Sequence, residues 1–530
     1  MGCGDESAIR GPSAGLVRWL TERNQPFMSS ATEPAVAAEQ PAEPRRTWSA
    51  RLFSLPTVLG LTLVSILYII TGSDRVVQPM EDPDIYWHLR NALQLMHSGH
   101  FIRTETWTFT VGGQPWINFE WLAEIPYYFA NLWFGERGIF AVMMLLLSGI
   151  VAGIYSLARL RSHDPRAAFV ATFVGYQFIT VSLGPRTLLF GWLFFVLELA
   201  ILWNLERGRD FTAWLPLLFL VWINTHGSWL IGFVLMVVFF ACGLVGGEWG
   251  NLTATRWTRS QRRKFLMVTG VSFALLFINP YGWRLVAYPL DVAYQQKLTI
   301  QHVAEWYSLN FHEFRGKATL ATLFLLGVLQ LVRKRKWSLQ DLAFVLIGVY
   351  GGFTYVRFVF LLGIVIVPLL AMDLAGLMGQ KYDPATDKRL PNAVAVAVLL
   401  AVIAGFWAPE RKIHAGIAET YPEKALPWVH SLAGRGNLFN DSEWGGYLEW
   451  NAPEVKEFID GRIDIFVHKG VMQDYLDAID IQRPFEVMDK YQIRYVFVDK
   501  TFPLAYVLRH SSAWKVDYQD DVAVGFERVQ

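Results

Sequence analysis

The apolar stretch LPTVLGLTLVSILYIITG (55–72) decides the fold class of this chain. It has no charged residue, and about 20 such residues span the ~30 Å hydrocarbon core of a bilayer as one helix. Comparable runs recur along most of the sequence. We therefore predict a polytopic α-helical membrane protein with about eleven transmembrane helices, near residues 55–72, 137–158, 167–183, 187–203, 212–224, 228–246, 265–279, 318–332, 340–354, 357–376 and 391–408.

The composition agrees with a membrane protein. Only 18% of the residues are charged and 53% are hydrophobic, whereas about a quarter of the residues of a soluble domain are charged. The net charge of +1 gives no field that would attract nucleic acid, so we expect none as a partner. The two cysteines, Cys3 and Cys242, suggest neither a disulfide framework nor a metal cluster.

Alternate loops between the predicted helices are short and basic. By the positive-inside rule they face the cytoplasm, and an odd number of helices puts the N-terminus inside and the C-terminal segment outside. The expected location is therefore a cell membrane crossed many times. The basic loops are ARLRSHDPR (158–166), NLERGRD (204–210), TRWTRSQRRK (255–264), VRKRKW (332–337) and GQKYDPATDKR (379–389).

Three regions follow from these patterns. Residues 1–54 are polar and rich in Ala and Pro, and we expect a disordered cytoplasmic tail. Residues 55–408 form the transmembrane domain, with large outer loops at 73–136 and 280–317. Residues 409–530 alternate helix and strand patterns, with a strand expected in KEFIDGRIDIF (456–466), and predict a small soluble α/β domain outside the membrane.

The first outer loop opens with the acidic motif EDPDIYWHLR (81–90), which holds Glu81, Asp82 and Asp84. If a helix begins near Asp84, His88 lies one turn later on the same face. A carboxylate beside an apolar bundle suits a general base or a cation site. The alternative is that these acids cap a helix among solvated headgroups.

Other polar residues stand at the outer ends of predicted helices. Arg186 and Arg357 run against the positive-inside bias and would suit the phosphate of a lipid carrier, although either side chain can also snorkel to lipid headgroups. Asn224 and His226 lie in the turn of VWINTHGSWL, which is either functional or an ordinary polar hairpin tip. Glu305 is a further acid in the second outer loop.

The order of the motifs resembles the bacterial integral-membrane glycosyltransferases of the GT-C superfamily, near the protein mannosyltransferases and the lipid A aminoarabinose transferases. The resemblance covers roughly residues 55–500. It rests on EDPDIYWHLR, RTETWTF (103–109), QPWINFEWLAE (114–124), WINTHGSWLIG (222–232), INPYGW (278–283), AEWYS (304–308) and DGRIDIF (460–466).

The resemblance implies a GT-C fold and a sugar donor linked to a polyprenyl phosphate or diphosphate. The sugar is transferred with inversion on the extracytoplasmic face, and an acid of the first outer loop serves as the base. That acid is Asp82 or Asp84 here. Many relatives carry an Asp-Glu pair, whereas this chain has Glu81-Asp82-Pro83-Asp84, so the choice stays open. We favour Asp84, because Pro83 turns the two side chains apart and His88 follows.

We expect the donor phosphate to bind Arg186, Arg357 and His226, with further substrate contacts from Glu81, His88, Glu120, Asn224 and Glu305. The departing phosphate is a good leaving group, so no cofactor is required and no metal ligand is assigned. If a divalent cation binds, the acidic motif is its natural place.

The expected partners are a polyprenyl-phosphate sugar lipid, an acceptor that is a glycan, lipid or protein, and the lipids of a bacterial inner membrane in the cell envelope. Two other functions stay open, a transporter or flippase for an anionic lipid-linked substrate and a non-catalytic assembly subunit. In the C-terminal segment, we expect Asp460 and Arg462 of DGRIDIF to form an ion pair that orders a turn, with ligand binding as the alternative.

Overall fold

The computed structural model of the chain describes residues 47–72, 82–407 and 410–529. It divides into two compact units, Met1–Arg51 and Leu52–Gln530. Residues 1–46 of the expected tail lie outside the described residues, as does Glu81 of the acidic motif. Trp48–Leu52 form a short helix, α2, where we expected the disordered tail to continue.

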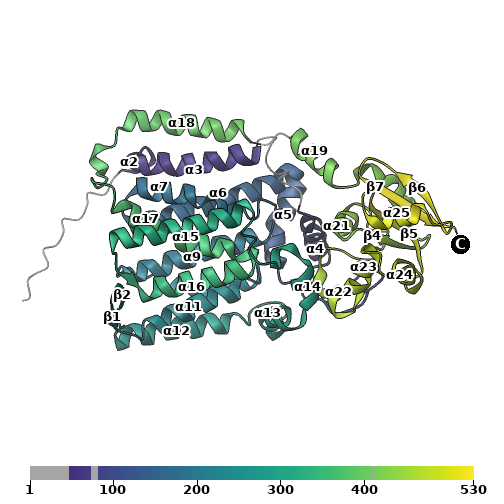
Figure 1. Cartoon of the computed structure of the whole chain (residues 1–530), viewed down its shortest axis with the longest axis horizontal. Helices are drawn as coiled ribbons and strands as arrows, with labels where there is room; N and C mark the ends of the chain where they lie inside the picture. The colour runs from purple at the N-terminus through teal and green to yellow at the C-terminus, as the bar shows by residue number, and fades with distance from the viewer. Residues whose placement is uncertain (1–46, 73–81, 408–409, 530) are drawn as a thin grey trace, which may run out of the picture. The chain divides into compact units, whose positions relative to one another are not determined.

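A helix lies at each of the eleven predicted positions in the unit Leu52–Gln530, and the long helices run side by side (Figure 1). Helix α17 is the central one, because it packs against α6, α7 and α16 and is buried along almost its whole length. The bundle helices are α3 (Leu55–Gly72), α6 (Glu136–Ser162), α7 (Pro165–Val174), α8 (Tyr176–Ile179), α9 (Leu188–Glu206), α10 (Leu215–Ile223), α11 (Trp229–Cys242), α12 (Arg259–Leu275), α15 (Phe314–Arg333), α16 (Leu339–Thr354), α17 (Val359–Ala375) and α18 (Arg389–Gly405).

Several helix boundaries follow from capping residues in the sequence. Helix α6 ends at Ser162, and the backbone of the next residue, His163, has the left-handed conformation with φ 59°. The Asp164 side chain then accepts hydrogen bonds from two backbone N–H groups of α7. Thr258 and Gln261 form a reciprocal capping box at the start of α12. These local signals explain why the loops between the helices are short.

Five described helical segments are long and apolar enough to cross a membrane: α3, α6, α9, α15 and Val356–Ala375. A sixth is present if α18 and α19 (Glu410–Thr420) together make one bent span. Four shorter apolar helices accompany them, at Pro165–Val174, Thr212–Ile223, Trp229–Cys242 and Leu339–Thr354. The chain is therefore mostly helical and apolar in the way of a membrane protein, and the count of eleven spans stays a prediction.

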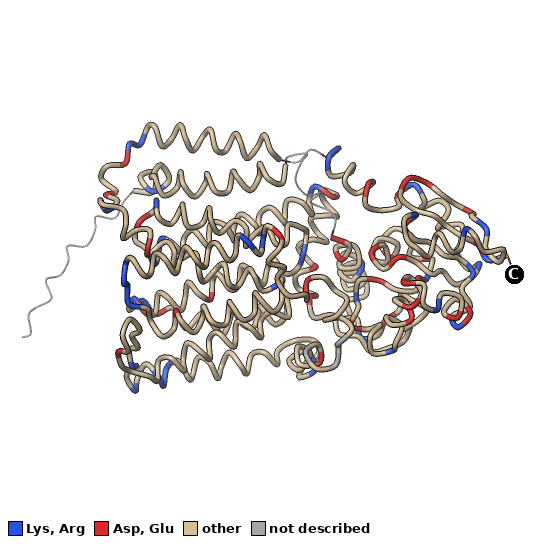
Figure 2. The backbone as a smooth tube through the Cα atoms, in the orientation of Figure 1, with Lys and Arg blue, Asp and Glu red and all other residues tan. Residues whose placement is uncertain are grey.

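The five basic loops meet at one end of the bundle, where Figure 2 shows a concentration of Lys and Arg. Arg161 at the end of α6 pairs with Glu206 at 3.2 Å and with Asp341 at 2.6 Å. A short sheet joins two of these loops: strand β2 (Leu252–Ala254) pairs with both β1 (Gly247–Trp249) and β3 (Trp337–Ser338). The helices thus alternate in direction, as the basic pattern predicts.

The C-terminal segment contains a mixed four-stranded sheet in the order β4-β5-β7-β6. Strands β4 and β5 are parallel, and the remaining pairs are antiparallel. The strand expected within 456–466 is wrong, because residues 456–462 form a loop and α22 begins at Ile463. The elements are α20 (Leu426–Ser431), β4 (Asn437–Asn440), α21 (Ser442–Asn451), α22 (Ile463–His468), α23 (Val471–Ile479), α24 (Pro484–Lys490), β5 (Ile493–Asp499), α25 (Pro503–Arg509), β6 (Trp514–Gln519) and β7 (Ala523–Arg528).

The first outer loop and the C-terminal segment share a hydrophobic core. Trp87, Ile102 and Trp116 of the loop belong to the same buried cluster as Phe439 and Phe458. Helix α4 (Asp84–Ser98) packs against α21, and Thr108 forms a β-bridge with Glu457. The acidic motif is therefore held between the bundle and the C-terminal segment.

Candidate functional site

Arg186 joins the first and second outer loops through two carboxylates. It lies just before α9, and its Nε donates to Asp82 Oδ2 at 2.7 Å while its Nη1 donates to Glu305. Glu305 lies in the short helix η3 (Ala304–Trp306). Although burial opposes it, the charges of Asp82 and Glu305 raise the pKa of Arg186, so its guanidinium is fixed and positive.

Asp84 is the first residue of α4, and His88 follows one helical turn later. Asp84 Oδ1 accepts from Trp87 Nε1 at 2.9 Å, and its backbone N–H donates to Asp82 Oδ1 at 3.2 Å. Burial, and then the charge of Asp82, raise the pKa of the Asp84 carboxyl well above its usual range. The two aspartates thus have different surroundings, since only Asp82 pairs with Arg186.

Arg357 comes close to the same ion pair from the start of the central helix. It lies in η4 (Val356–Phe358), and its guanidinium stacks 4.4 Å from the ring centre of Trp306, the residue after Glu305. A guanidinium over an indole face is a favourable cation–π contact. Arg186 and Arg357 therefore contact two adjacent residues, Glu305 and Trp306.

A chain of buried polar side chains begins beside this ion pair. Glu120 Oε1 accepts from Thr187 Oγ1 at 2.8 Å and lies 3.3 Å from His226 Nε2, while its Oε2 lies 3.7 Å from His88 Nε2. His88 Nδ1 in turn lies 3.0 Å from Glu124 Oε1. Glu124 belongs to α5 (Trp121–Phe134), so the chain connects α4, α5 and the turn between α10 and α11.

The residues at both ends of this chain of polar side chains also have hydrogen-bond partners. Glu124 accepts from Asn91 at 2.9 Å and from Asn118 at 2.8 Å. His226 Nδ1 lies 2.9 Å from Ser228 Oγ. Every member of the chain thus has protein partners, which fixes the geometry of the site.

Burial decides the charge states in the chain. It raises the pKa of the Glu124 carboxyl to about 8 and lowers the pKa of His88 to about 4. Burial also raises the pKa of Glu120, against the opposing charge of His88. The His88–Glu124 contact is therefore a neutral hydrogen bond near pH 7 rather than an ion pair.

The structure brings most of the predicted site residues to one end of the bundle. Arg186, Arg357 and His226 do not touch one another directly, but the charges of both arginines act on His226. Asn224 is occupied by the protein: its Oδ1 accepts from Trp121, and its Nδ2 donates to the carbonyls of Leu220 and Ile278. Asn224 therefore links neighbouring helices through these hydrogen bonds.

Two residues of the buried chain were absent from our sequence-based set, Glu124 and Thr187. Glu124 carried a signal, because an acid inside the apolar segment WLAEIPYYF is costly unless it has partners. Thr187 carried no sequence signal other than its position next to Arg186. Its role depends on the approach of Glu120, which a sequence pattern does not reveal.

A cavity of about 570 Å³ is lined in part by Pro115, Trp116 and Ile117 of the first loop, close to Glu120 in the sequence. It lies between the first loop, α13 (Trp283–Gln295) and α22. In its wall Tyr288 donates to Asp464 at 2.9 Å, and His468 pairs with Asp291 at 3.0 Å. Tyr288 also stacks on Phe119, the residue before Glu120, at 4.7 Å.

Comparisons with known proteins give the fold. No family model matches the sequence, and no curated protein matches it. Two crystal structures of the oligosaccharyltransferase of Archaeoglobus fulgidus do match the structure, each at 13% identity and a TM-score of 0.51. The apo form covers 86% of this chain and 70% of the archaeal one. The form tethered to an acceptor peptide with the NVT sequon covers 91% and 75%. At this identity the likeness shows a shared fold.

Proposed function

We propose that the chain is a glycosyltransferase that moves a sugar from a polyprenyl-phosphate-type lipid to an acceptor on the extracytoplasmic face, with inversion. One observation carries the proposal: a first-loop carboxylate, Asp82, pairs with a half-buried arginine, Arg186, at 2.7 Å. Asp84 lies beside this pair. An acid next to a phosphate-binding cation is the minimum that direct displacement needs, and the GT-C fold supports this reading.

Asp84 is the base that we favour. Its raised pKa, caused first by burial and then by the charge of Asp82, makes its ionised carboxylate a stronger proton acceptor than an ordinary aspartate. Asp82 is already paired with Arg186. We propose that Asp82 orients the guanidinium while Asp84 takes the proton of the acceptor hydroxyl or amine.

Two arginines suit the departing phosphate. Arg186 offers a guanidinium whose charge is held by Asp82 and Glu305, and Arg357 offers a second beside Trp306. Guanidinium groups bind phosphate through two parallel hydrogen bonds, so they stabilise the charge that develops on the leaving group. His226 reaches this region only through Glu120, and we propose that it positions Glu120.

The acidic residues around Arg186 are a poor fit for a metal ion. The guanidinium already binds Asp82 and Glu305, and it occupies the place between these two carboxylates that a cation would take. A metal ion there would have to displace the guanidinium of Arg186 from both carboxylates. We therefore propose that arginine charge, rather than a required cofactor, balances the donor phosphate.

The cavity between the first loop, α13 and α22 is the place that we propose for the acceptor. Its aromatic wall, with Trp116, Trp283 and Tyr288, and its carboxylates Asp291 and Asp464 suit the faces and hydroxyl groups of a glycan or the polar backbone of a peptide. The archaeal oligosaccharyltransferase with a tethered acceptor peptide supports an acceptor of this general kind.

The proposal is tested by release of polyprenyl phosphate from a labelled polyprenyl-phosphate sugar, with the full chain in detergent and an envelope extract as the acceptor source. Asp84→Asn should lower the turnover by ~10²–10⁴-fold, as loss of a general base does. Asp82→Asn should lower it less. Glu486→Gln, at an acid that is 74% exposed in its side chain, is the matched control and should turn over at the wild-type rate.

The variant with both substitutions, Asp82→Asn and Asp84→Asn, tests whether the acidic motif takes part in the reaction. If Asp82→Asn, Asp84→Asn and the double variant all fold and keep wild-type turnover, the acidic motif is structural and the proposed mechanism fails. Circular dichroism and the melting temperature of each variant separate loss of chemistry from loss of fold.

A further inference from the structure

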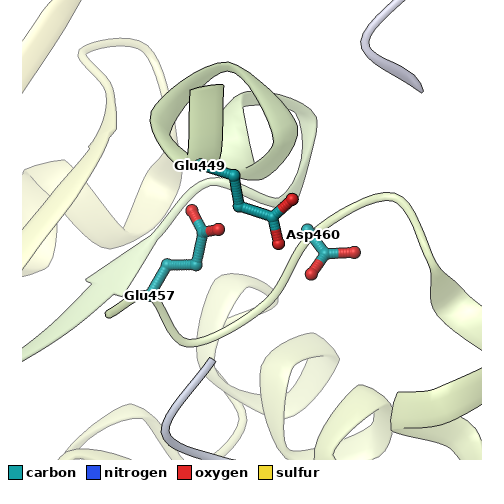
Figure 3. A group of neighbouring side chains, drawn as sticks. All are labelled: Glu449, Glu457 and Asp460. Atoms are coloured by element: carbon teal, nitrogen blue, oxygen red, sulfur yellow. The ribbon is translucent and has the colours of Figure 1, made fainter. Parts of the chain in front are cut away.

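Three carboxylates converge in the C-terminal segment, far along the chain from the acidic motif. Glu449 lies on α21, and Glu457 and Asp460 lie on the loop before α22; their side chains point toward one another (Figure 3). One oxygen from each lies within 4.8 Å of the others. The three residues are only 3%, 1% and 0% exposed.

Arg462 balances part of this charge. It donates to Asp460 at 2.5 Å, to Glu449 at 2.7 Å and to Glu105 of the first loop at 3.2 Å. Its guanidinium is also stacked near Trp107, at 4.3 Å from the ring centre. Among the described residues, Arg462 thus pairs with three of the four buried carboxylates and not with Glu457, whereas Arg186 pairs with both acids beside it. Buried charge without a counterion is costly.

Glu457 is the carboxylate of this cluster whose charge is least balanced by neighbouring groups. Within the part of the chain that the structure describes, neither of its carboxyl oxygens has a hydrogen-bond partner, and Oε2 of Glu449 has none either. Buried polar atoms in native proteins nearly always have partners.

The loop that carries Glu457 and Asp460 is already well fixed. Asn440 Oδ1 accepts from the backbone N–H of Phe458 at 2.8 Å, and its Nδ2 donates to the carbonyl of Ile459 at 2.7 Å. On the other side, Phe109 N–H donates to the carbonyl of Glu457 at 3.2 Å. The backbone of this loop is therefore fixed by hydrogen bonds that do not involve the three carboxylates.

We propose that Glu449, Glu457 and Asp460 bind a Ca²⁺ ion that joins α21 to the loop before α22. Only oxygen ligands are present, and hard cations prefer these. Two oxygens on opposite sides of a Ca²⁺ ion, each ~2.4 Å away, are about 4.8 Å apart, and one oxygen from each of the three carboxylates lies within that distance of the others. Mg²⁺ needs a tighter octahedron and should bind more weakly. None of these three residues is among those proposed to carry out the glycosyl transfer.

The ion would brace the surroundings of Asp84. Gly461, between Asp460 and Arg462, lies against Asp84, since a Cβ on it would stand 2.2 Å from Asp84 Oδ1. The backbone of Glu457 also forms a β-bridge with Thr108 of the first loop. The proposed role is therefore structural: the ion holds the first loop and the C-terminal segment together.

The test uses the full chain in detergent, stripped with a chelator and then titrated with CaCl₂ or MgCl₂. We expect Ca²⁺ to raise the melting temperature by roughly 2–5 °C and Mg²⁺ to do less. Tb³⁺ should show luminescence sensitised by Trp107 and Trp116, and Ca²⁺ should displace it. No effect of either cation on the wild type overturns the proposal and leaves a pair of carboxyl groups that share protons.

Glu457→Gln locates the site. It keeps the size of the side chain and removes the charge, so the affinity for Ca²⁺ should fall at least tenfold and the Tb³⁺ signal should disappear. Glu486→Gln in the same segment should bind as the wild type does. If Glu457→Gln responds to Ca²⁺ as the wild type does, the ion binds elsewhere and the proposal is wrong. If Glu457→Gln does not fold, the same Ca²⁺ and Tb³⁺ measurements are made on Glu449→Gln, and the same outcomes support or overturn the proposal.

Discussion

The site depends on which side chains are charged. Asp82, Arg186 and Glu305 form a charged group, whereas His88 and Glu124 are buried and neutral. A sequence shows that each of these residues can titrate, but it does not show which are desolvated. The site residues in our set were therefore found by residue type and position, and Glu124 was missed because its role depends on burial.

The buried proton of Glu124 predicts a pH-dependent stability. The pKa of Glu124 is raised to about 8 in the folded state, so between about pH 4.5 and 8 the folded chain holds a proton that the unfolded chain has released. Its stabilising contribution is complete at low pH and is lost as the pH rises toward 8. His88, with a lowered pKa of about 4, acts in the opposite direction, but only below about pH 6.5.

Between pH 6.5 and 8 the free energy of unfolding should fall, by up to about 1.4 kcal/mol per pH unit from this one group. Glu124→Gln carries no such proton, so its stability should depend less on pH in that range. Chemical unfolding of both proteins at pH 6.5, 7.25 and 8 measures the difference, with Glu486→Gln as the control. Equal slopes for Glu124→Gln and the wild type would show that Glu124 is ionised in the folded chain.

At the scale of elements, the periodic segments were predictable and the irregular ones were not. The predicted helix at 55–72 coincides with α3, and 340–354 coincides with α16 within one residue. The apolar residues of KEFIDGRIDIF look like a strand, but the Asp460–Arg462 ion pair turns the chain and α22 follows. The predicted ion pair is thus confirmed, although its consequence for the strand was missed.

The contact between α4 and the C-terminal loop predicts an effect of Gly461. A Cβ at this position would stand 2.2 Å from Asp84 Oδ1, so Gly461→Ala should push the Asp84 carboxylate aside. Displacement of a catalytic group by about 1 Å costs up to ~10²-fold in rate, and we expect turnover of the lipid donor to fall at least tenfold.

Gly270→Ala is the matched control for this substitution, because no atom lies within 4 Å of a Cβ at Gly270 in α12. It should keep wild-type turnover and should leave the melting temperature unchanged or slightly raised, as alanine favours a helix over glycine. If Gly461→Ala turns over the donor as well as Gly270→Ala does, the position of Asp84 does not matter for the reaction.

At the scale of the whole molecule, the C-terminal segment is joined to the first outer loop more closely than its composition suggests. Arg462 binds Glu105 of that loop at 3.2 Å, and both are almost fully buried. We predicted a separate domain from residue 409, since the alternation of helix and strand patterns is a local signal. Pairing between residues 357 positions apart is not visible in such patterns. Any inhibitor or mutation that loosens this contact should therefore act on the acidic motif.

The topology predicts that the basic loops and the C-terminal segment lie on opposite sides of the membrane. We expect residues near Arg161, Arg263 and Arg335 to be cytoplasmic and Asp460 to be outside, because the loops that meet at one end of the bundle are the basic ones. Asp460 itself is 0% exposed, so a reagent would not reach a cysteine there. Lys469, an exposed residue shortly after it, is the better position.

In a Cys3→Ser, Cys242→Ala background, Lys469→Cys should react with a membrane-impermeant maleimide in intact cells or spheroplasts, and Arg263→Cys only after the membrane is opened. Both positions are exposed in the structure, so a difference between them reports the side of the membrane rather than burial. Labelling of both positions from the same side would overturn the odd number of spans. The Asp82–Arg186 pair would then need to be reassigned to the other face.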